Sequence, residues 1–430
     1  MGAYGSLRVA RLDLVEMHTT INAGVLALFT PAERQETHEL YEGYDESTPE
    51  DEKEWEDAYF YAAPVGVLCD RLDVIGYTEA RARRHFRAYS LMNKENPDSY
   101  QLPVADFEGW QRHIAYAADQ KLSQWSINSV QNRERRLPRQ VLQSWDELEY
   151  PRLAEFFDDD EYYSGIRLGF PTEDCDTYLF LRAIWSSLDR ELPVVLDYTS
   201  FINEGYFDSP ELFLELRDKT TFQASLNTVL LTEGSTDQAV LGRALAYRFG
   251  HLAHLYRFLD FHGGKVAGGA PELVKLVRAF AGCGLSGRFI AIFDADTAAA
   301  EALSELDQAR LPDNIKVLQL PELEAAKQYP TIGPQGDNVV MDVNCMACSL
   351  EMYLGRSALQ SSSGELVKVQ WSGYSKKMRR YQGELIGKDQ VRERFLERLE
   401  REPGSLDWSG LDLIFGRVFE AFNQDQVETR

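Results

Sequence analysis

The sequence has few cysteines, no long apolar run and little positive charge. Its five cysteines are widely scattered, at Cys69, Cys175, Cys283, Cys345 and Cys348. A disulfide scaffold needs more of them at closer spacing, so a reducing, cytoplasmic environment is expected. No stretch approaches the roughly 18 consecutive apolar residues that indicate a transmembrane helix, so no membrane association is expected.

Positive charge is scarce relative to negative charge. The 430 residues include 45 Lys and Arg against 69 Asp and Glu, which gives a formal net charge of −24. This balance excludes a general basic coat that attracts any nucleic acid or anionic membrane. It does not exclude a nucleic-acid enzyme, because a site that processes phosphates can carry its positive charge as bound metal.

Two further motifs are missing or incomplete. No GxxxxGK[ST] segment occurs, which excludes a P-loop ATPase. The CxxC motif at 345–348 lacks a second pair of ligands, and a structural zinc site needs four. We therefore expect Cys345 and Cys348 to pack as small side chains at a turn between a strand and a helix.

The composition divides the chain into four predicted parts. Residues 1–60 form a small N-terminal segment with an acidic loop at 42–57, where nine acids oppose one lysine. Residues 61–220 have the apolar spacing of helices. Strands and helices alternate over 221–360, and residues 361–430 form a basic, helical C-terminal extension.

Within these parts, 65–92 and 235–259 are each predicted to be a single long helix, because apolar residues recur at helical spacing. Strands are predicted at NTVLLTE (227–233), GRFIAIFDAD (287–296) and NIKVLQLP (314–321). Alternating strands and helices imply a parallel sheet with helices on both faces. The expected fold class is therefore α/β, or α+β overall, with a mostly helical N-terminal region followed by this sheet.

Acidic residues follow two of these strands at the point where each strand ends. Glu233 and Gly234 follow one strand, with Asp237 in the first turn of the next helix, and Asp294 and Asp296 follow another. In an open parallel sheet, ligands bind outside the carboxyl ends of the strands. If the strands are neighbours, four carboxylates converge, and they cannot all stay ionised without a counter-charge. Hard oxygen ligands suit Mg²⁺ or Mn²⁺, which can polarise phosphoryl oxygens, so the pattern predicts phosphodiester chemistry.

The segments EGSTD (233–237) and FDAD (293–296) together resemble the Toprim motif, which has a Glu-Gly turn on one strand and Asp-x-Asp on a later one. The wider sequence resembles the bacterial HEPN/Toprim-associated proteins over nearly the whole chain. That resemblance is carried by MGAYGSLRVARLDL, GFPTEDCDTYLFLRAIW, FLDFHGGKVAGGAPELVKLVRAFAG, and YPTIGPQG with DVNCMACSLEMYLG. It implies a helical HEPN-like region at 61–220 joined to a Toprim-like catalytic domain of OLD-nuclease type at 221–360.

The resemblance also implies roles for individual residues. The implied catalytic residues are five acids and one lysine: Glu233, Asp237, Asp294, Asp296, Glu351 and Lys388. Of these, Glu233, Asp294 and Asp296 would hold a first metal ion, and Asp237 and Glu351 would help with a second. Glu351 resembles the additional acid of OLD-type nucleases by order and context. Its alternative is an ordinary glutamate on a helix surface, and Asp342 is the rival position.

The stretch 368–401 is locally basic, with ten Lys and Arg against five Asp and Glu. Lys388 within it is a candidate for stabilising transition-state charge. A second group of cations stands beside aromatic residues: Lys376, Lys377, Arg379 and Arg380, next to Trp371, Tyr374 and Tyr381. Basic residues interleaved with aromatics suit a nucleic-acid backbone and its bases. A solvated helix end is the alternative interpretation.

HEPN ribonucleases resemble one another in an Arg-x4–6-His motif on a helix, and this sequence departs from that pattern. Arg81 and His85, for example, have only three residues between them. We therefore expect the helical region to mediate homodimerisation, sensing or binding of a defence-system partner protein.

The leading hypothesis is a metal-dependent nuclease that acts on DNA, or less favourably on RNA, as a bacterial anti-phage defence effector. The alternative is a non-catalytic sensor or regulatory binding module. A third option is a toxin-like RNase acting on tRNA.

Overall fold

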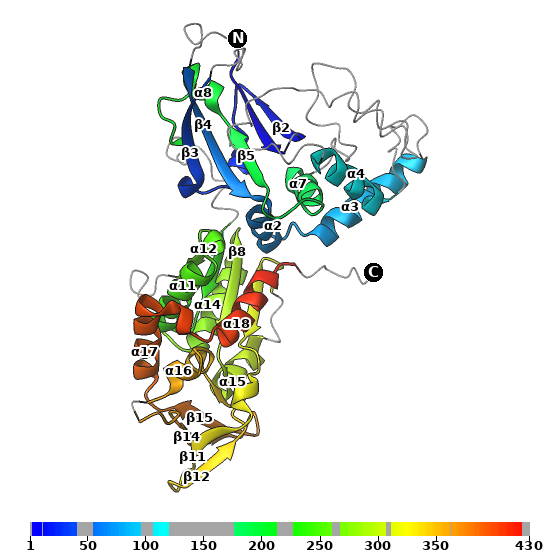
Figure 1. Ribbon diagram of the computed structural model, residues 1–430. Coiled ribbons are helices and arrows are strands. Elements are labelled where there is room, and N and C mark those ends of the chain that lie inside the picture. Colours follow the sequence, from blue (N-terminus) through cyan, green and yellow to red (C-terminus); the bar gives the residue numbers. More distant parts are fainter. Residues whose placement is uncertain are drawn as a thin grey trace. The chain divides into compact units, whose positions relative to one another are not determined.

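A computed structural model of the chain describes residues 2–10, 12–40, 55–95, 106–119, 176–212, 227–259, 267–306, 311–361 and 363–423. Most of the predicted acidic loop at 42–57 lies outside these ranges. The chain divides into two compact units, Met1–Gln223 and Ala224–Arg430 (Figure 1). Each unit combines helices with β-sheet, which confirms the expected α+β class.

The first unit is built on a five-stranded antiparallel sheet with the order β2-β1-β5-β4-β3. Its strands are β1 Tyr4–Val9, β2 Leu12–His18, β3 Arg34–Leu40, β4 Trp55–Pro64 and β5 Pro193–Asp197. The central strand β5 is a continuous apolar run, with Val194, Val195 and Leu196 buried. The helical region is predicted to begin at residue 61, but β4 continues to Pro64 and the first helix after it begins at Val65, where the predicted helix 65–92 begins. The run of aromatic and small residues in β4 suits a strand paired on both sides.

Helices pack beside this sheet (Figure 1). The helical elements of the first unit are α1 Ala23–Leu26, η1 Pro31–Glu33, α2 Val65–Val74, α3 Glu79–Glu95, α4 Phe107–Asp119, α7 Thr177–Trp185 and α8 Thr199–Asn203. The single helix predicted over 65–92 is instead two helices. Gly76, with a φ of 89°, ends the first of them, because a left-handed residue cannot continue an α-helix.

The second unit is built on a four-stranded sheet with the order β10-β8-β6-β7. Its strands are β6 Thr228–Leu231, β7 Tyr256–Phe258, β8 Arg288–Phe293 and β10 Ile315–Gln319, and every pairing is parallel. Its helices are α11 Ser235–Arg248, α12 Gly250–Ala253, α14 Ala270–Cys283 and α15 Thr297–Leu306. The predicted parallel sheet is confirmed. The single helix predicted over 235–259 is wrong, because the chain breaks near Gly250 and then enters the edge strand β7.

A second four-stranded sheet, with mixed parallel and antiparallel pairing, follows in the second unit in the order β12-β11-β14-β15. Its strands are β11 Tyr329–Ile332, β12 Asn338–Met341, β14 Val369–Ser375 and β15 Arg380–Leu385. A separate short pair joins β9 Ala295–Asp296 to β13 Ala347–Cys348. The remaining elements are η5 Glu324–Ala326, η6 Leu350–Tyr353, α16 Arg356–Leu359, α17 Lys388–Arg401, η7 Pro403–Ser405 and α18 Ser409–Glu420. The C-terminal extension is therefore not helical throughout, since it begins with the β14–β15 hairpin.

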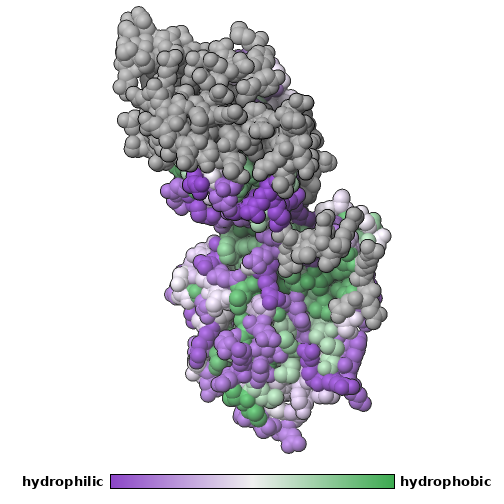
Figure 2. All heavy atoms as spheres, turned by 90° about the vertical axis from the view of Figure 1, so that its right-hand side faces the viewer, coloured by the Kyte–Doolittle hydropathy of each residue, from purple (hydrophilic) through white to green (hydrophobic). Residues whose placement is uncertain are grey.

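The core of the second unit lies between the parallel sheet and the helices α14 and α15. Leu231, Phe293, Val277 and Ala299 are among its fully buried members. On the face that Figure 2 shows, hydrophilic and hydrophobic residues alternate in patches over the described part of this unit. No helix in the described ranges is long and apolar enough to cross a membrane.

Candidate functional site

The acids predicted from the sequence meet at the carboxyl ends of two neighbouring strands. Strands β6 and β8 pair in parallel, with Leu231 opposite Ala291, so Glu233 and Asp294 leave the sheet side by side. The backbone N–H of Asp294 donates to the Glu233 carboxylate Oε1 over 2.9 Å. The four carboxylates were expected to converge if the two strands are neighbours. Strands β6 and β8 are neighbours, so this condition is met.

The turn after β6 is held by backbone contacts that leave no room for larger residues. The backbone N–H of Gly269 donates to the carbonyl oxygen of Glu233 over 2.7 Å. A Cβ atom added at Gly268 would lie 3.0 Å from that same oxygen, so the two segments approach closely only because a glycine stands there. Helix α11 begins directly after Gly234, and Asp237 consequently lies in its first turn.

Asp294 and Asp296 are positioned by the elements that follow β8. The Asp296 carboxylate accepts the backbone N–H of Ala299 over 2.7 Å and so caps the start of α15. Asp296 also belongs to β9, which pairs with β13 through Ala347. This pairing brings the next segment of chain to the site, where the backbone N–H of Leu350 donates to the Asp294 carboxylate over 3.1 Å.

Glu351 lies in η6, one residue after that contact. Its side chain is 2% exposed, and its Oε1 forms an ion pair of 2.9 Å with Nη1 of Arg392. The hydroxyl of Ser349 donates to its other oxygen over 2.5 Å. The alternative of a glutamate on a helix surface is therefore wrong. The rival, Asp342, closes a local turn instead, by accepting hydrogen bonds from the backbone and side-chain nitrogens of Asn344.

Burial disfavours the charged form of these carboxylates and therefore raises their pKa values. It raises the pKa of Glu233 to about 7, against the hydrogen bond from the Asp294 backbone and with further repulsion from Asp296 and Asp237. It also raises the pKa of Asp237 to about 6, with Glu351 adding to the shift. The pKa of Asp294 is raised well above its usual range by burial and then by repulsion from Glu233. Burial raises the pKa of Asp296 as well.

Two cations of helix α17 face the acidic cluster, which comprises Glu233, Asp237, Asp294, Asp296 and Glu351. Lys388 lies at the start of the helix, where its Nζ is 3.3 Å from the Glu384 carboxylate. Although burial acts to lower the pKa of Lys388, attraction to Glu351 and Asp294 raises it overall. Arg392 follows one helical turn later, and it is not among the site residues that the sequence predicts.

A signal for Arg392 was present in the sequence. Residues four, seven and eleven positions apart share one face of a helix, and Lys388 and Arg392 stand on the same face as the buried Phe395 and Leu399. A cation on the buried side of an amphipathic helix is unusual. Such a position marks a charge that needs a partner inside the protein.

The carboxylate oxygens are ligands that suit a hard divalent cation, but the side chains do not form a complete coordination sphere. Within the described ranges, no group of three or more His, Cys, Asp or Glu side chains is arranged to hold a metal ion. Glu233, Asp294 and Asp296 each direct an oxygen to a backbone N–H. The remaining carboxylate oxygens and the excess of buried negative charge are what Mg²⁺ or Mn²⁺ would satisfy.

Comparison with known proteins identifies the first unit. Residues 1–223 match the family described as HEPN/Toprim N-terminal domain 1. The chain belongs to this family. The match confirms the relationship to HEPN/Toprim-associated proteins expected from the sequence, and it suggests a nuclease-related or defence-associated role. No curated protein and no solved structure matches the chain. The carboxylates lie outside the matched residues, so their roles rest on their geometry.

The predicted nucleic-acid-binding residues of this HEPN/Toprim-family protein lie in and beside the tight turn of the β14–β15 hairpin. Lys376, Lys377 and Arg379 are exposed there. The guanidinium of Arg380 makes a contact within the protein instead, because its Nη1 donates to the carbonyl oxygen of Cys345 over 3.0 Å. The carbonyl of Tyr381 accepts the Thr297 hydroxyl over 2.6 Å, which ties the hairpin to the start of α15 beside Asp296.

The aromatic residues of the hairpin differ in exposure. Tyr374 and Tyr381 are 55% and 48% exposed, and their rings meet edge to face at 5.4 Å. They are available for stacking with a base. Trp371 is only 5% exposed, so it packs in the protein and cannot contact nucleic acid.

The two residues of the CxxC motif differ in their surroundings. Cys348 is buried in β13, where its thiol contacts the carbonyl oxygen of Val343, and burial raises its pKa. Cys345 is partly exposed in the turn before it, with a φ of 56°. Both thiols are free.

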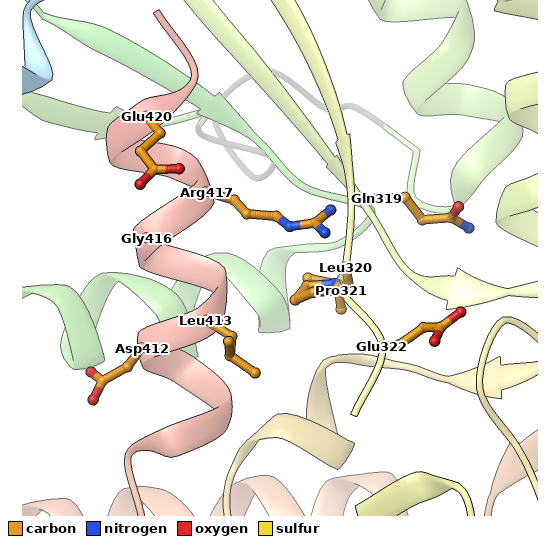
Figure 3. Close-up of a pocket in the computed structure, with 9 residues that line it drawn as sticks. All are labelled: Gln319, Leu320, Pro321, Glu322, Asp412, Leu413, Gly416, Arg417 and Glu420. Atoms are coloured by element: carbon orange, nitrogen blue, oxygen red, sulfur yellow. The ribbon is translucent and has the colours of Figure 1, made fainter. Parts of the chain in front are cut away.

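A cavity of about 650 Å³ lies between α18 and the end of β10 in this protein. Arg417 extends from α18 toward Leu320 and Pro321, while Asp412 and Glu420 point away from them (Figure 3). Gln319, at its edge, donates from its side chain to the carbonyl oxygen of Asp294 over 3.1 Å. The cavity therefore adjoins the strand that carries the acidic cluster.

Proposed function

We propose that the protein is a Mg²⁺- or Mn²⁺-dependent nuclease of Toprim type, which cleaves or nicks the phosphodiesters of DNA in an anti-phage defence response. The observation that carries this proposal is the pair of partly buried carboxylates, Glu233 and Asp294, joined across the ends of two neighbouring parallel strands. Strand ends of this kind are where open α/β sheets bind their ligands. Titratable groups with strongly perturbed pKa values gather at functional sites.

Three of the acids and the cations near them have separate parts in this proposal. Glu233, Asp294 and Asp296 would hold one divalent ion, whose chemistry is to polarise a phosphoryl oxygen. Lys388 supplies a fixed positive charge close to Asp294 and favours a phosphate that becomes more negative during reaction. The exposed cations of the hairpin turn bind the nucleic-acid backbone, and the tie between Tyr381 and Thr297 places that turn beside the acids.

The decisive experiment compares Asp294→Asn with Asp313→Asn. Asp313 is exposed and lies outside the cluster, so it controls for the same loss of one carboxylate. Plasmid, single-stranded DNA and total RNA are each incubated with protein and Mn²⁺. We expect cleavage by the wild type and by Asp313→Asn, and a loss of at least about 100-fold in Asp294→Asn, more than the 10- to 100-fold usual for residues behind a ligand.

Because the carboxylate of Asp294 is disfavoured by burial, its replacement by an amide should not lower the melting temperature. A folded Asp294→Asn protein that cuts as fast as wild type would show that the cluster is not catalytic.

One observation favours a second candidate function, a sensor or regulatory module that binds nucleic acid or a partner without cutting. Glu351 is already paired with Arg392, and three other acids accept backbone hydrogen bonds, so four of the acids have partners without metal. Calorimetric titration with Mg²⁺ and with Mn²⁺ separates the two functions. Heat of binding to wild type that disappears in Asp294→Asn supports the nuclease, and no binding of either ion supports the sensor.

A further inference from the structure

Arg392 joins three separate segments at the edge of the acidic cluster. Its Nη1 lies 2.9 Å from the Glu351 carboxylate in η6 and 2.9 Å from the hydroxyl of Thr236 in α11. Its Nη2 contacts the carboxylate of Asp389 on its own helix. The Arg392 side chain is 17% exposed, so the guanidinium is held in place on several sides.

The guanidinium stands where positive charge is needed beside Asp237 and Glu351. Its contacts hold it against Glu351 in η6 and against Thr236, the residue directly before Asp237, in α11. Arg392 therefore gives this pair of acids the compensation that a divalent ion would give. Among the described residues, no ion pair joins an arginine to Glu233 or Asp294, and the Nζ of Lys388 contacts Glu384 instead.

A metal ion and Arg392 would compete for the same oxygens of Glu351. Mg²⁺ binds carboxylate oxygens at about 2.0–2.1 Å, a distance that leaves no place for a guanidinium nitrogen on the same side of the oxygen. Oε1 of Glu351 already contacts Arg392, and Oε2 already accepts the hydroxyl of Ser349. A second ion would have to displace a partly buried, hydrogen-bonded cation.

We propose that Arg392 occupies the position of a second cation, so that the protein binds a single divalent ion through Glu233, Asp294 and Asp296. This inference rests on the proposed function, since it concerns how many ions the same cluster takes. It makes Arg392 a positioning residue that fixes Glu351 and sets the metal stoichiometry. A planar guanidinium also suits a phosphate oxygen, so the second positive charge of the site is built into the chain.

The test counts bound Mn²⁺ by electron paramagnetic resonance and by calorimetry at pH 8 in three forms of the full chain. Wild type and Arg392→Lys, which keeps the charge, should each bind one ion. Arg392→Gln should bind two, because Asp237 and Glu351 then lose the guanidinium beside them. Two ions in wild type, or one ion in a folded Arg392→Gln protein, would overturn the inference and leave the proposed nuclease standing.

A second variant keeps the test decisive if Arg392→Gln does not fold. Glu351→Gln should still bind one ion, with Kd within about threefold of wild type, because Glu351 does not touch that ion. A loss of about tenfold or more, the size expected for a ligand or its immediate support, would show that Glu351 does bind the metal and would overturn the inference. An absence of Mn²⁺ binding in every form would overturn the inference and the nuclease together. One bound ion without any cleavage would remove the nuclease alone.

Discussion

The two units of the protein treat buried charge in opposite ways. In the first unit, the Arg71 guanidinium is 2% exposed and reaches both oxygens of Glu33, at 2.7 and 2.9 Å, as well as the carbonyl of Leu28. Arg182 likewise meets both oxygens of Asp73, at 2.8 and 3.1 Å. Each of these buried cations therefore has a matched anion in a two-bond geometry.

In the second unit, acids outnumber cations at the strand ends. Glu233, Asp237, Asp294 and Asp296 all have raised pKa values, and burial is the first cause in each case. Matched charge joins elements of the fold, whereas charge left in excess is costly and is often found at functional sites. Under the proposed function, the excess charge of the second unit is the part that a ligand uses.

The largest expected effect on the free energy of unfolding tests the matched ion pairs of the first unit. Arg71→Met leaves Glu33 without its partner and should lower the free energy of unfolding by about 3 to 5 kcal/mol. Urea denaturation measures the loss, and hydrogen–deuterium exchange should locate it within residues 1–223. Arg190→Met is the control, since its pair with Asp70 is more exposed and should contribute less than about 1 kcal/mol. Equal losses in the two variants would contradict the structural role of buried pairing.

The second prediction tests the excess negative charge of the acidic cluster through the pH dependence of the free energy of unfolding. Because Glu233 and Asp237 have pKa values of about 7 and about 6 in the folded protein, they hold protons more tightly than in the unfolded chain. Unfolding then releases protons, so the metal-free protein should lose stability as pH rises from about 4 to about 7. The expected contribution of each group is on the order of 1 to 3 kcal/mol, since a tenfold difference in proton affinity between the folded and unfolded states corresponds to about 1.4 kcal/mol.

Unfolding curves of Glu233→Gln and Asp313→Asn across this pH range provide the measurement. The slope should flatten in Glu233→Gln and remain in Asp313→Asn. At pH 7, Mn²⁺ at about 100 times its Kd should restore about 2.7 kcal/mol to the wild type. A wild-type slope that Glu233→Gln leaves unchanged would mean that this carboxyl is not the source of the excess charge.

The smallest effect concerns exposed positive charge in the second unit. Replacing Lys376, Lys377 and Arg379 with Ala should weaken nucleic-acid binding and reduce its salt dependence, by about 0.9 in the log–log slope for each lost contact to duplex phosphate. Fluorescence anisotropy with a labelled oligonucleotide at several salt concentrations measures both quantities. Lys327→Ala is the control, because that lysine is paired with Glu324. An unchanged slope in the triple variant would remove the hairpin from the binding surface.

Much of the fold of the second unit could be predicted from local pattern. The apolar runs of β6 and β8 and the acids at their ends are visible as sequence, and the parallel pairing followed from the alternation of strands and helices. The hairpin β14–β15 was not predicted, because its basic residues resemble a solvated helix end and its strands gain their burial from contacts with α15 and β13. Edge strand β7 was missed because only three residues form it, within a helical pattern.

The candidate site could be predicted less completely than the fold. Glu233 and Asp294 were expected to meet only on the condition that their strands are neighbours, and the pairing of β6 with β8 supplies that condition. Arg392 was not predicted as a site residue: its helical spacing to Phe395 and Leu399 places it on the buried face, but arginines on amphipathic helices usually face solvent. Its role depends on η6 and α11 lying against α17, which no local pattern encodes.

The sequence by itself determined the strand ends, the acid types and their order along the chain, because hydrophobic run length and glycine placement act locally. The tertiary structure decided which charges are matched and which are not. Strand order set Glu233 against Asp294, and helix packing set Arg392 against Glu351. Burial and electrostatic pairing arise between segments far apart in the chain, so they become defined only when those segments pack together.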